Sequence, residues 1–119
     1  MFKINNNEFT LLNKYKLFIN ELDNLIENIP RKDYFYKDKI RVVSNLIIEL
    51  ILKLNYDEDN ISYYKTNIKG NIAYLDFLLD RLFTLKYISE KNLCSIGEKL
   101  IEINKMVTKW INNKYESIN

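Results

Sequence analysis

The sequence contains no histidine, one cysteine (Cys94), one proline and two glycines. Without histidine, the chain can build neither histidine-ligated metal sites nor the Ser-His and Cys-His pairs of nucleophilic enzymes. With only Gly70 and Gly97, it also lacks the glycine-rich loop that cradles phosphate groups. We therefore expect a protein that is not an enzyme and that uses no cofactor.

Long apolar runs are also missing. The uncharged apolar stretch from Val42 to Ile48 is far shorter than the ~20 residues of a membrane-spanning helix, so no membrane association is expected. The segment Met1–Asn7 has neither the apolar centre nor the small-residue cleavage site of a secretory signal. These absences favour a reducing, cytoplasmic location, in which a lone cysteine needs no disulfide partner.

One acidic cluster, Asp57, Glu58 and Asp59, has two interpretations. Adjacent carboxylates are typical of metal sites, but the cluster lacks the central glycine and the closing glutamate of a calcium-binding loop. The alternative is a solvated turn between two helices, whose acids lie near the positive N-terminal end of the second helix. We favour the turn and expect no metal.

What the chain does have is a helical repeat of apolar residues. Its 119 residues, 47% hydrophobic and 29% charged, are enough for one domain with a buried core. Apolar residues recur in steps of three and four over residues 7–29, 34–56, 62–86 and 90–114, which predicts four helices. Helices of this length joined by short linkers favour an all-α, antiparallel up-down-up-down four-helix bundle spanning residues 1–119. The fourth segment has the most regular repeat, through Leu93, Ile96, Leu100, Ile103, Val107 and Trp110.

Several residues mark expected helix boundaries. Pro30 should end the first helix. Ser89 is a good N-cap for the fourth helix, with Ile88 and Leu93 spaced as a hydrophobic staple. Gly70, inside the third helix, predicts either a close approach of a neighbouring helix or a bend.

A second set of apolar residues lies off the main stripes, and we expect its members to be exposed on a single bundle. They either form a surface for a partner or a second copy of the chain, or are the isolated apolar residues found on any protein surface. They are Leu11, Leu17, Ile48, Leu78, Leu85, Ile101 and Ile111.

Charge is the remaining functional signal. The net charge is only +2, but the stretch 31–41 carries five cations against Asp33 and Asp38. Tyr34, Phe35 and Tyr36 lie among these cations, and such aromatic residues stack on nucleic-acid bases. Either the stretch binds nucleic acid or it is the solvated start of a helix. The candidate nucleic-acid-binding residues are Arg31, Lys32, Lys37, Lys39 and Arg41, with Lys105 and Lys109 one turn apart on the fourth helix.

Four short motifs, in order, resemble one protein family. They are the helix junction Ile29–Lys32, the run Leu75–Leu79, the turn Lys86–Ser89 and the ending Glu102–Ile111, which contains Trp110-Ile111. Together they resemble the accessory variability determinant (Avd) proteins of diversity-generating retroelements, over residues 15–112. The four-helix proteins encoded by intervening sequences in ribosomal RNA genes are a weaker match, because Asn45–Glu49 replaces their Asn-Ile-Ala-Glu-Gly signature.

The resemblance implies a non-catalytic accessory protein. In such proteins four-helix protomers form a homopentameric barrel that binds the retroelement reverse transcriptase and its template RNA, and so supports mutagenic cDNA synthesis. Arg31, Lys32, Arg41 and Lys105 match basic positions of the family. The alternative is an oligomeric scaffold or protein-partner module without a nucleic-acid role.

One departure from the family lies on the third helix. Where Avd proteins can present arginines on its outer face, this chain has Asp76 and Asp80. This change leaves three alternatives. The RNA is held elsewhere, for example along residues 31–41; the polymerase supplies the positive surface; or the chain has another partner.

Overall fold

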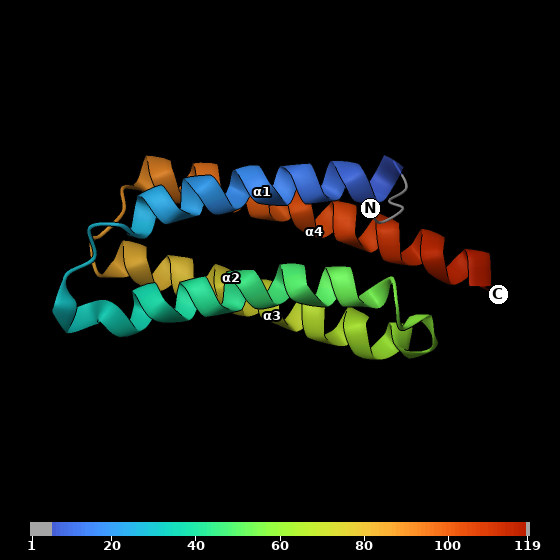
Figure 1. Cartoon of the computed structure of the whole chain (residues 1–119). Helices are drawn as coiled ribbons and strands as arrows, with labels where there is room; N and C mark the ends of the chain where they lie inside the picture. The colour runs from blue at the N-terminus through green and yellow to red at the C-terminus, as the bar shows by residue number, and fades with distance from the viewer. Residues whose placement is uncertain (1–5, 119) are drawn as a thin grey trace.

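The computed structural model describes residues 6–118, so the expectation for the start of the chain falls largely outside the described residues. Four long helices are joined by short connections (Figure 1). Residues 6–118 contain no strand, which confirms the all-α class. In chain order the elements are α1 (Asn6–Ile26), the 3-10 helix η1 (Arg31–Asp33), α2 (Tyr34–Leu54), the 3-10 helix η2 (Glu58–Asn60), α3 (Ile61–Thr84) and α4 (Glu90–Ile118).

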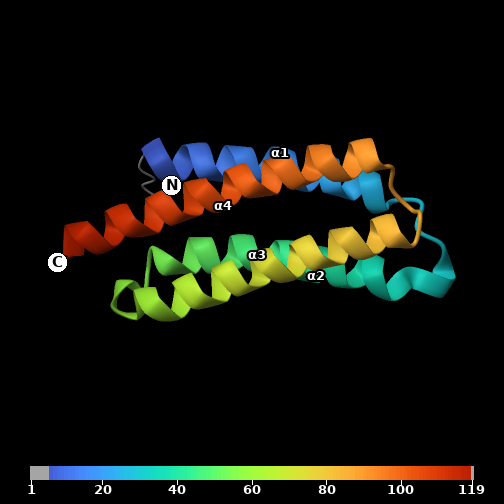
Figure 2. The same ribbon diagram turned by 180° about the vertical axis from the view of Figure 1, so that it is seen from behind.

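The helices alternate in direction and form a four-helix bundle measuring 48 × 25 × 22 Å. In sequence order each helix packs against the next, and α4 returns to pack against α1. Seen from both sides, α1 and α4 form one pair and α2 and α3 the other (Figures 1 and 2). Helices α2 and α4 consequently lie at opposite corners of the bundle.

Each helix contributes a buried apolar stripe to one core. The stripes are wider than expected, because every helix faces two neighbours. Leu11, Leu78 and Ile111 are at most 1% exposed, so the prediction that they would be exposed is wrong. Each of them lies three or four residues from a core residue of the same helix, on the flank that faces a neighbouring helix. Leu17 and Ile101 do remain exposed, at 66% and 57%, while Ile48 and Leu85 are half-buried.

Helix α1 ends at Ile26, three residues before the expected end. The residue before a proline is disfavoured in helical conformation, and the Ile29 amide closes a turn onto the Ile26 carbonyl at 3.3 Å. The Lys37 ammonium donates a hydrogen bond of 2.9 Å to the Glu27 carbonyl. A lysine from α2 therefore caps the negative C-terminal end of α1.

Helix α3 ends at Thr84, two residues before the expected end. Lys86 has a φ angle of +68°, in the left-handed region where glycine is usual. The Lys86 amide bonds the Phe83 carbonyl and the Tyr87 amide bonds the Leu82 carbonyl, both at 2.9 Å. These two bonds form a Schellman motif with lysine in the position that glycine usually occupies.

The start of α4 follows the prediction. The Ser89 hydroxyl accepts the Asn92 amide at 3.0 Å, which confirms Ser89 as the N-cap. Ile88 belongs to the buried core, and the half-buried Leu93 packs against that core. At Gly70, by contrast, an added Cβ would meet nothing within 4 Å, so of the two alternatives given for this residue the close helix approach is wrong.

Candidate nucleic-acid interface

The predicted basic residues fall into two separate groups. Arg31, Lys32, Lys37, Lys39 and Arg41 lie in η1 and the first turns of α2, at the end of the bundle where α1 joins α2 (Figure 1). Lys105 and Lys109 lie on the outside of α4. They are some 22 to 28 Å along α4 from its start, at a rise of about 1.5 Å per residue. Because α2 and α4 occupy opposite corners, the structure does not bring the two groups together.

Within the first group, Arg31, Lys32 and Arg41 are exposed, whereas Lys39 is half-buried. Lys37 already caps α1 and lies 5.5 Å from the centre of the Tyr34 ring. Arg31, Lys32 and Arg41 are therefore the cations of this stretch best placed to meet an anionic ligand.

The turn between α3 and α4 lies beside η1 and adds a further cation. The Tyr87 hydroxyl donates a hydrogen bond to the Asp33 carboxylate, which ties the two connections together. That hydrogen bond, together with burial and the charge of Asp33, raises the pKa of Tyr87 above its usual value. Lys86 is exposed in the same turn. Because it lies far from Arg31 in the sequence, no local pattern could have added Lys86 to the site.

Aromatic side chains accompany these cations. Tyr34 is 47% and Phe35 63% exposed, and aromatic side chains exposed in this way can stack on bases. Tyr36 is half-buried, and the Arg81 guanidinium lies 5.7 Å from the centre of its ring. We refer to the exposed set as the basic end, which comprises Arg31, Lys32, Tyr34, Phe35, Arg41 and Lys86.

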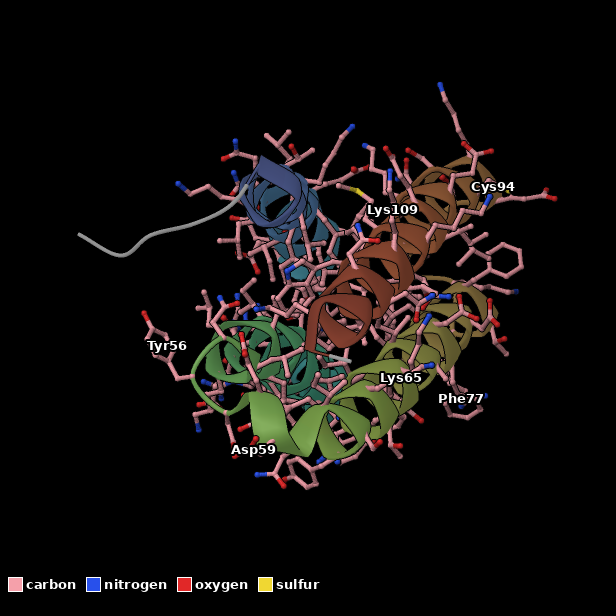
Figure 3. All side chains as sticks on the ribbon, turned by 90° about the vertical axis from the view of Figure 1, so that its right-hand side faces the viewer. Tyr56, Asp59, Lys65, Phe77, Cys94 and Lys109 are labelled. Carbon is pink, nitrogen blue, oxygen red and sulfur yellow. The ribbon has the colours of Figure 1, made fainter. Side chains whose placement is uncertain are left out.

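The second group gains two lysines from α3. Figure 3 shows Lys65 and Lys109 on the neighbouring helices α3 and α4. The Lys69 ammonium donates to the Asn104 side-chain oxygen at 2.8 Å and to the Thr108 hydroxyl. Burial and the nearby charge of Lys65 lower the pKa of Lys69. Asp76 and Asp80 lie farther along α3, so this side of the molecule carries both signs of charge.

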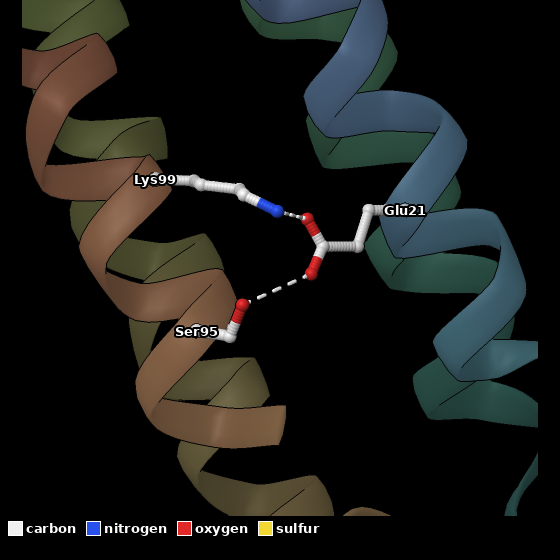
Figure 4. Close-up of polar contacts among 3 residues, drawn as sticks. All are labelled: Glu21, Ser95 and Lys99. Atoms are coloured by element: carbon white, nitrogen blue, oxygen red, sulfur yellow. Dashed lines mark hydrogen bonds and ion pairs between the residues drawn. The ribbon is translucent and has the colours of Figure 1, made fainter. Parts of the chain in front are cut away.

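A groove of about 490 Å³ lies between α1 and α4. Its cations are already paired: Lys14 lies 3.3 Å from Glu102, and Glu21 accepts hydrogen bonds from Lys99 and Ser95 (Figure 4). These contacts join the two helices and neutralise the groove. An anionic ligand finds no unpaired cation there.

Two residues of the acidic cluster that precedes α3, Asp57 and Glu58, contact other side chains of the protein. The Asp57 carboxylate accepts hydrogen bonds from the Asn60 side chain at 2.7 Å and from the Tyr64 hydroxyl at 3.0 Å. Glu58 pairs with Lys114 of α4 at 3.2 Å. Among residues 10–114, whose side chains the structure describes, there is no group of three cysteine, aspartate or glutamate side chains placed to hold a metal ion.

The same described residues include no helix that is long and apolar enough to span a bilayer. Compared with known proteins, the sequence matches no family model and no curated protein.

Proposed function

We propose that this chain is a non-catalytic accessory protein that binds a diversity-generating retroelement reverse transcriptase and its template RNA. The ordered motifs shared with the Avd family support this proposal. The observation that carries it is the basic end, where η1, α2 and the α3–α4 turn contribute exposed cations to the same end of the bundle as the exposed side chains of Tyr34 and Phe35.

The chemistry of the basic end suits RNA. Arginine and lysine neutralise phosphates and release counterions, while tyrosine and phenylalanine stack on unpaired bases. Loops and single-stranded segments of a folded RNA offer both features at once. A duplex hides its base faces, so we expect the protein to prefer unpaired regions.

A ring of five copies is part of the proposal. Five protomers would present the basic end five times on one particle, so that weak contacts act together on one RNA. The reverse transcriptase would then bind the same particle and be held close to its template. In this arrangement the accessory protein supplies positioning rather than chemistry.

Charge reversal tests the RNA contact. Arg31→Glu with Arg41→Glu should weaken the binding of a structured template RNA by at least tenfold, because two phosphate contacts are lost. The matched control is Lys16→Glu with Lys53→Glu, which makes the same change in net charge at two exposed lysines outside the basic end. Equal loss in both double variants would show only a general charge effect and would contradict the site.

A second candidate is a protein-binding scaffold with no nucleic-acid role. It is favoured by the exposed apolar side chains Leu17, Phe35, Val42, Phe77 and Ile101, each more than half exposed. Purification of the chain with a protein partner, with no RNA affinity and no effect on reverse transcription, would support this second candidate over the first.

A further inference from the structure

A groove with an apolar centre lies between α3 and α4, away from the basic end. Its centre is lined by Ile72 and Ala73 of α3 and by Leu100 and Ile101 of α4, and Ile101 is 57% exposed. Its volume of about 280 Å³ lies just below the range of about 300–1,000 Å³ that is usual for small-molecule sites. An apolar groove between two helices instead suits the side chains of a third helix, which enter at spacings of three and four residues. We call it the α3/α4 groove.

Charged side chains of α3 lie on both sides of this apolar centre. Lys65 and Lys69 precede Ala73 along the helix, whereas Asp76 and Asp80 follow it. All four are exposed except Lys69, which is half-buried. Along α3 the groove therefore has a positive half and a negative half.

Helix α4 continues the same division. A hydrogen bond of 2.8 Å from the Lys69 ammonium to the Asn104 side chain fixes the register of the two helices. Because α3 and α4 are antiparallel, Lys105 lies near the positive half and Glu98 near the negative half. Each half thus receives charges of one sign from both helices.

These charges have no opposite partners within the protein. Like charges one turn apart destabilise a helix, and α3 has two such pairs. Burial and the charge of Lys65 lower the pKa of Lys69, while burial and the charge of Asp80 raise the pKa of Asp76. Opposite charges on a ligand would relieve both effects. Among residues 10–114, whose side chains the structure describes, no ion pair includes Lys65, Lys69, Asp76, Asp80, Glu98 or Lys105.

The matching ligand has acidic groups at one end, an apolar middle and basic groups at the other end. The groove takes up the 15 residues from Lys65 to Asp80, which is about 22 Å along α3. An RNA strand carries negative charge along its whole length and would meet the acids of the negative half. An amphipathic helix of about four turns has the required length and can carry both signs of charge.

The charges also determine the direction of that helix. Acidic residues stabilise the first turn of a helix and basic residues its last turn, because of the helix dipole. A helix with this order places its acidic start beside Lys65 and Lys69 and its basic end beside Asp76 and Asp80. It then runs parallel to α3 and antiparallel to α4.

We propose that the α3/α4 groove binds an amphipathic helix of a partner protein, with acidic residues in its first turns, apolar residues in its middle and basic residues in its last turns. This docking does not rest on the RNA-binding function proposed above. It uses no second copy of the chain, so it applies equally to one copy and to each copy in a ring of five. It assigns Lys105 to a protein contact and gives Asp76 and Asp80 a role in binding.

Two designed peptides test the order of charges. Each is an alanine-rich helix of about 18 residues, long enough to span the groove, with equal numbers of glutamates and lysines and with leucines in the middle. The ordered peptide has its glutamates first and its lysines last, whereas the mixed peptide has both in each half. By fluorescence anisotropy, the ordered peptide should bind the wild-type chain about tenfold more tightly. Equal affinities would overturn the proposal. So would binding of neither peptide, as when another copy of the chain covers the groove.

Charge reversal of the negative half locates the contact. Asp76→Lys with Asp80→Lys makes α3 positive in both halves, so the ordered peptide should bind about tenfold more weakly. The matched control is Asp23→Lys with Asp38→Lys, which makes the same change in net charge at two exposed aspartates outside the groove. Equal weakening in the two double variants would overturn the proposal.

Reversal of the positive half separates a peptide site from an RNA site. Lys65→Glu with Lys105→Glu leaves the Lys69–Asn104 hydrogen bond in place and should weaken the ordered peptide about tenfold. RNA affinity should not change, and it tests the basic end separately. Weaker RNA binding with unchanged peptide binding would assign these lysines to RNA and overturn the proposal.

Filling the groove tests its apolar centre without a change of charge. Ala73→Trp should weaken the ordered peptide about tenfold, because the indole occupies the space that the leucines need. The control is Leu17→Trp, at a residue of α1 that is 66% exposed. Both substitutions are at exposed positions, so circular dichroism should show wild-type helix content. Unchanged peptide affinity in Ala73→Trp would overturn the proposal.

Cross-linking tests the direction of the bound helix. Thr66 and Thr84 are exposed, lie at opposite ends of the groove and are five turns apart, so they share one side of α3. In a Cys94→Ser background, an ordered peptide with an N-terminal cysteine should form a disulfide with Thr66→Cys and not with Thr84→Cys. Equal cross-linking, or a preference for Thr84→Cys, would contradict the proposed docking.

Discussion

Tyr15 offers the most quantitative test of the packing between α1 and α2. Its side chain is 1% exposed, and its hydroxyl donates a hydrogen bond to the Ser44 carbonyl of α2. Burial raises the pKa of Tyr15 well above the usual 10.0. Tyr15→Phe keeps the ring and removes only the hydroxyl. At pH 7 the lost hydrogen bond should lower the free energy of unfolding by about 1 kcal/mol.

The same substitution should have a smaller effect in alkali. Above pH 10 the unfolded chain loses the Tyr15 proton while the folded chain keeps it, so the wild type loses stability as the pH rises. At pH 11 this linkage amounts to about 1.4 kcal/mol, and the phenylalanine variant lacks it. The wild type should therefore be about 1 kcal/mol more stable than the variant at pH 7 and no more stable at pH 11.

Urea denaturation followed by Trp110 fluorescence at pH 7, 9, 10 and 11 measures this difference. Phe18→Leu is the control, because it weakens the same core without a titrating group, and its deficit should not change with pH. A Tyr15→Phe deficit that is as large at pH 11 as at pH 7 would refute the role of the buried hydroxyl.

Three further predictions concern stability and use the same denaturation assay. Lys86→Gly should raise the free energy of unfolding by about 1 kcal/mol, because glycine adopts the left-handed conformation without strain. Lys86→Ala is the control and should bring no such gain. Equal effects of the two substitutions would show that residue 86 is not strained. Gly70→Ala should raise the free energy of unfolding by up to ~1 kcal/mol, because alanine favours the helix more than glycine does and the new methyl meets open space. A loss of stability would show that the methyl meets a neighbouring group. Trp110→Ala and Leu100→Ala should each remove about 3 kcal/mol by opening a cavity, and a loss below about 0.5 kcal/mol would place the residue outside the core.

The sequence predicted the fold well where the signal was local and periodic. The three-four repeat from Leu93 to Trp110 places the buried stripe of α4, and Ser89 marks its start. Prediction failed where a second neighbour widened the stripe, as at Leu78, which the residue spacing alone places off the core. The predicted third helix also extended to Lys86, two residues too far, because no sequence pattern marks a lysine that ends a helix in the left-handed conformation.

The candidate site shows the same limit. The cations of residues 31–41 are adjacent in the sequence and were found from it. Lys86 joins them only through the Tyr87–Asp33 hydrogen bond, between residues 54 positions apart. Likewise, Lys69 contacts α4 through Asn104, 35 positions away, and the sequence alone does not show this contact.

The proposal that this chain is an RNA-binding accessory protein can be tested by measuring its affinity for a structured template RNA as a function of salt. We expect the affinity of the wild type to fall steeply between about 50 and 200 mM salt, because lysine and arginine contacts with phosphates release counterions. The Arg31→Glu, Arg41→Glu variant should bind more weakly and with a shallower salt dependence. Wild-type binding that is absent, or that is indifferent to both salt and this double substitution, would contradict it.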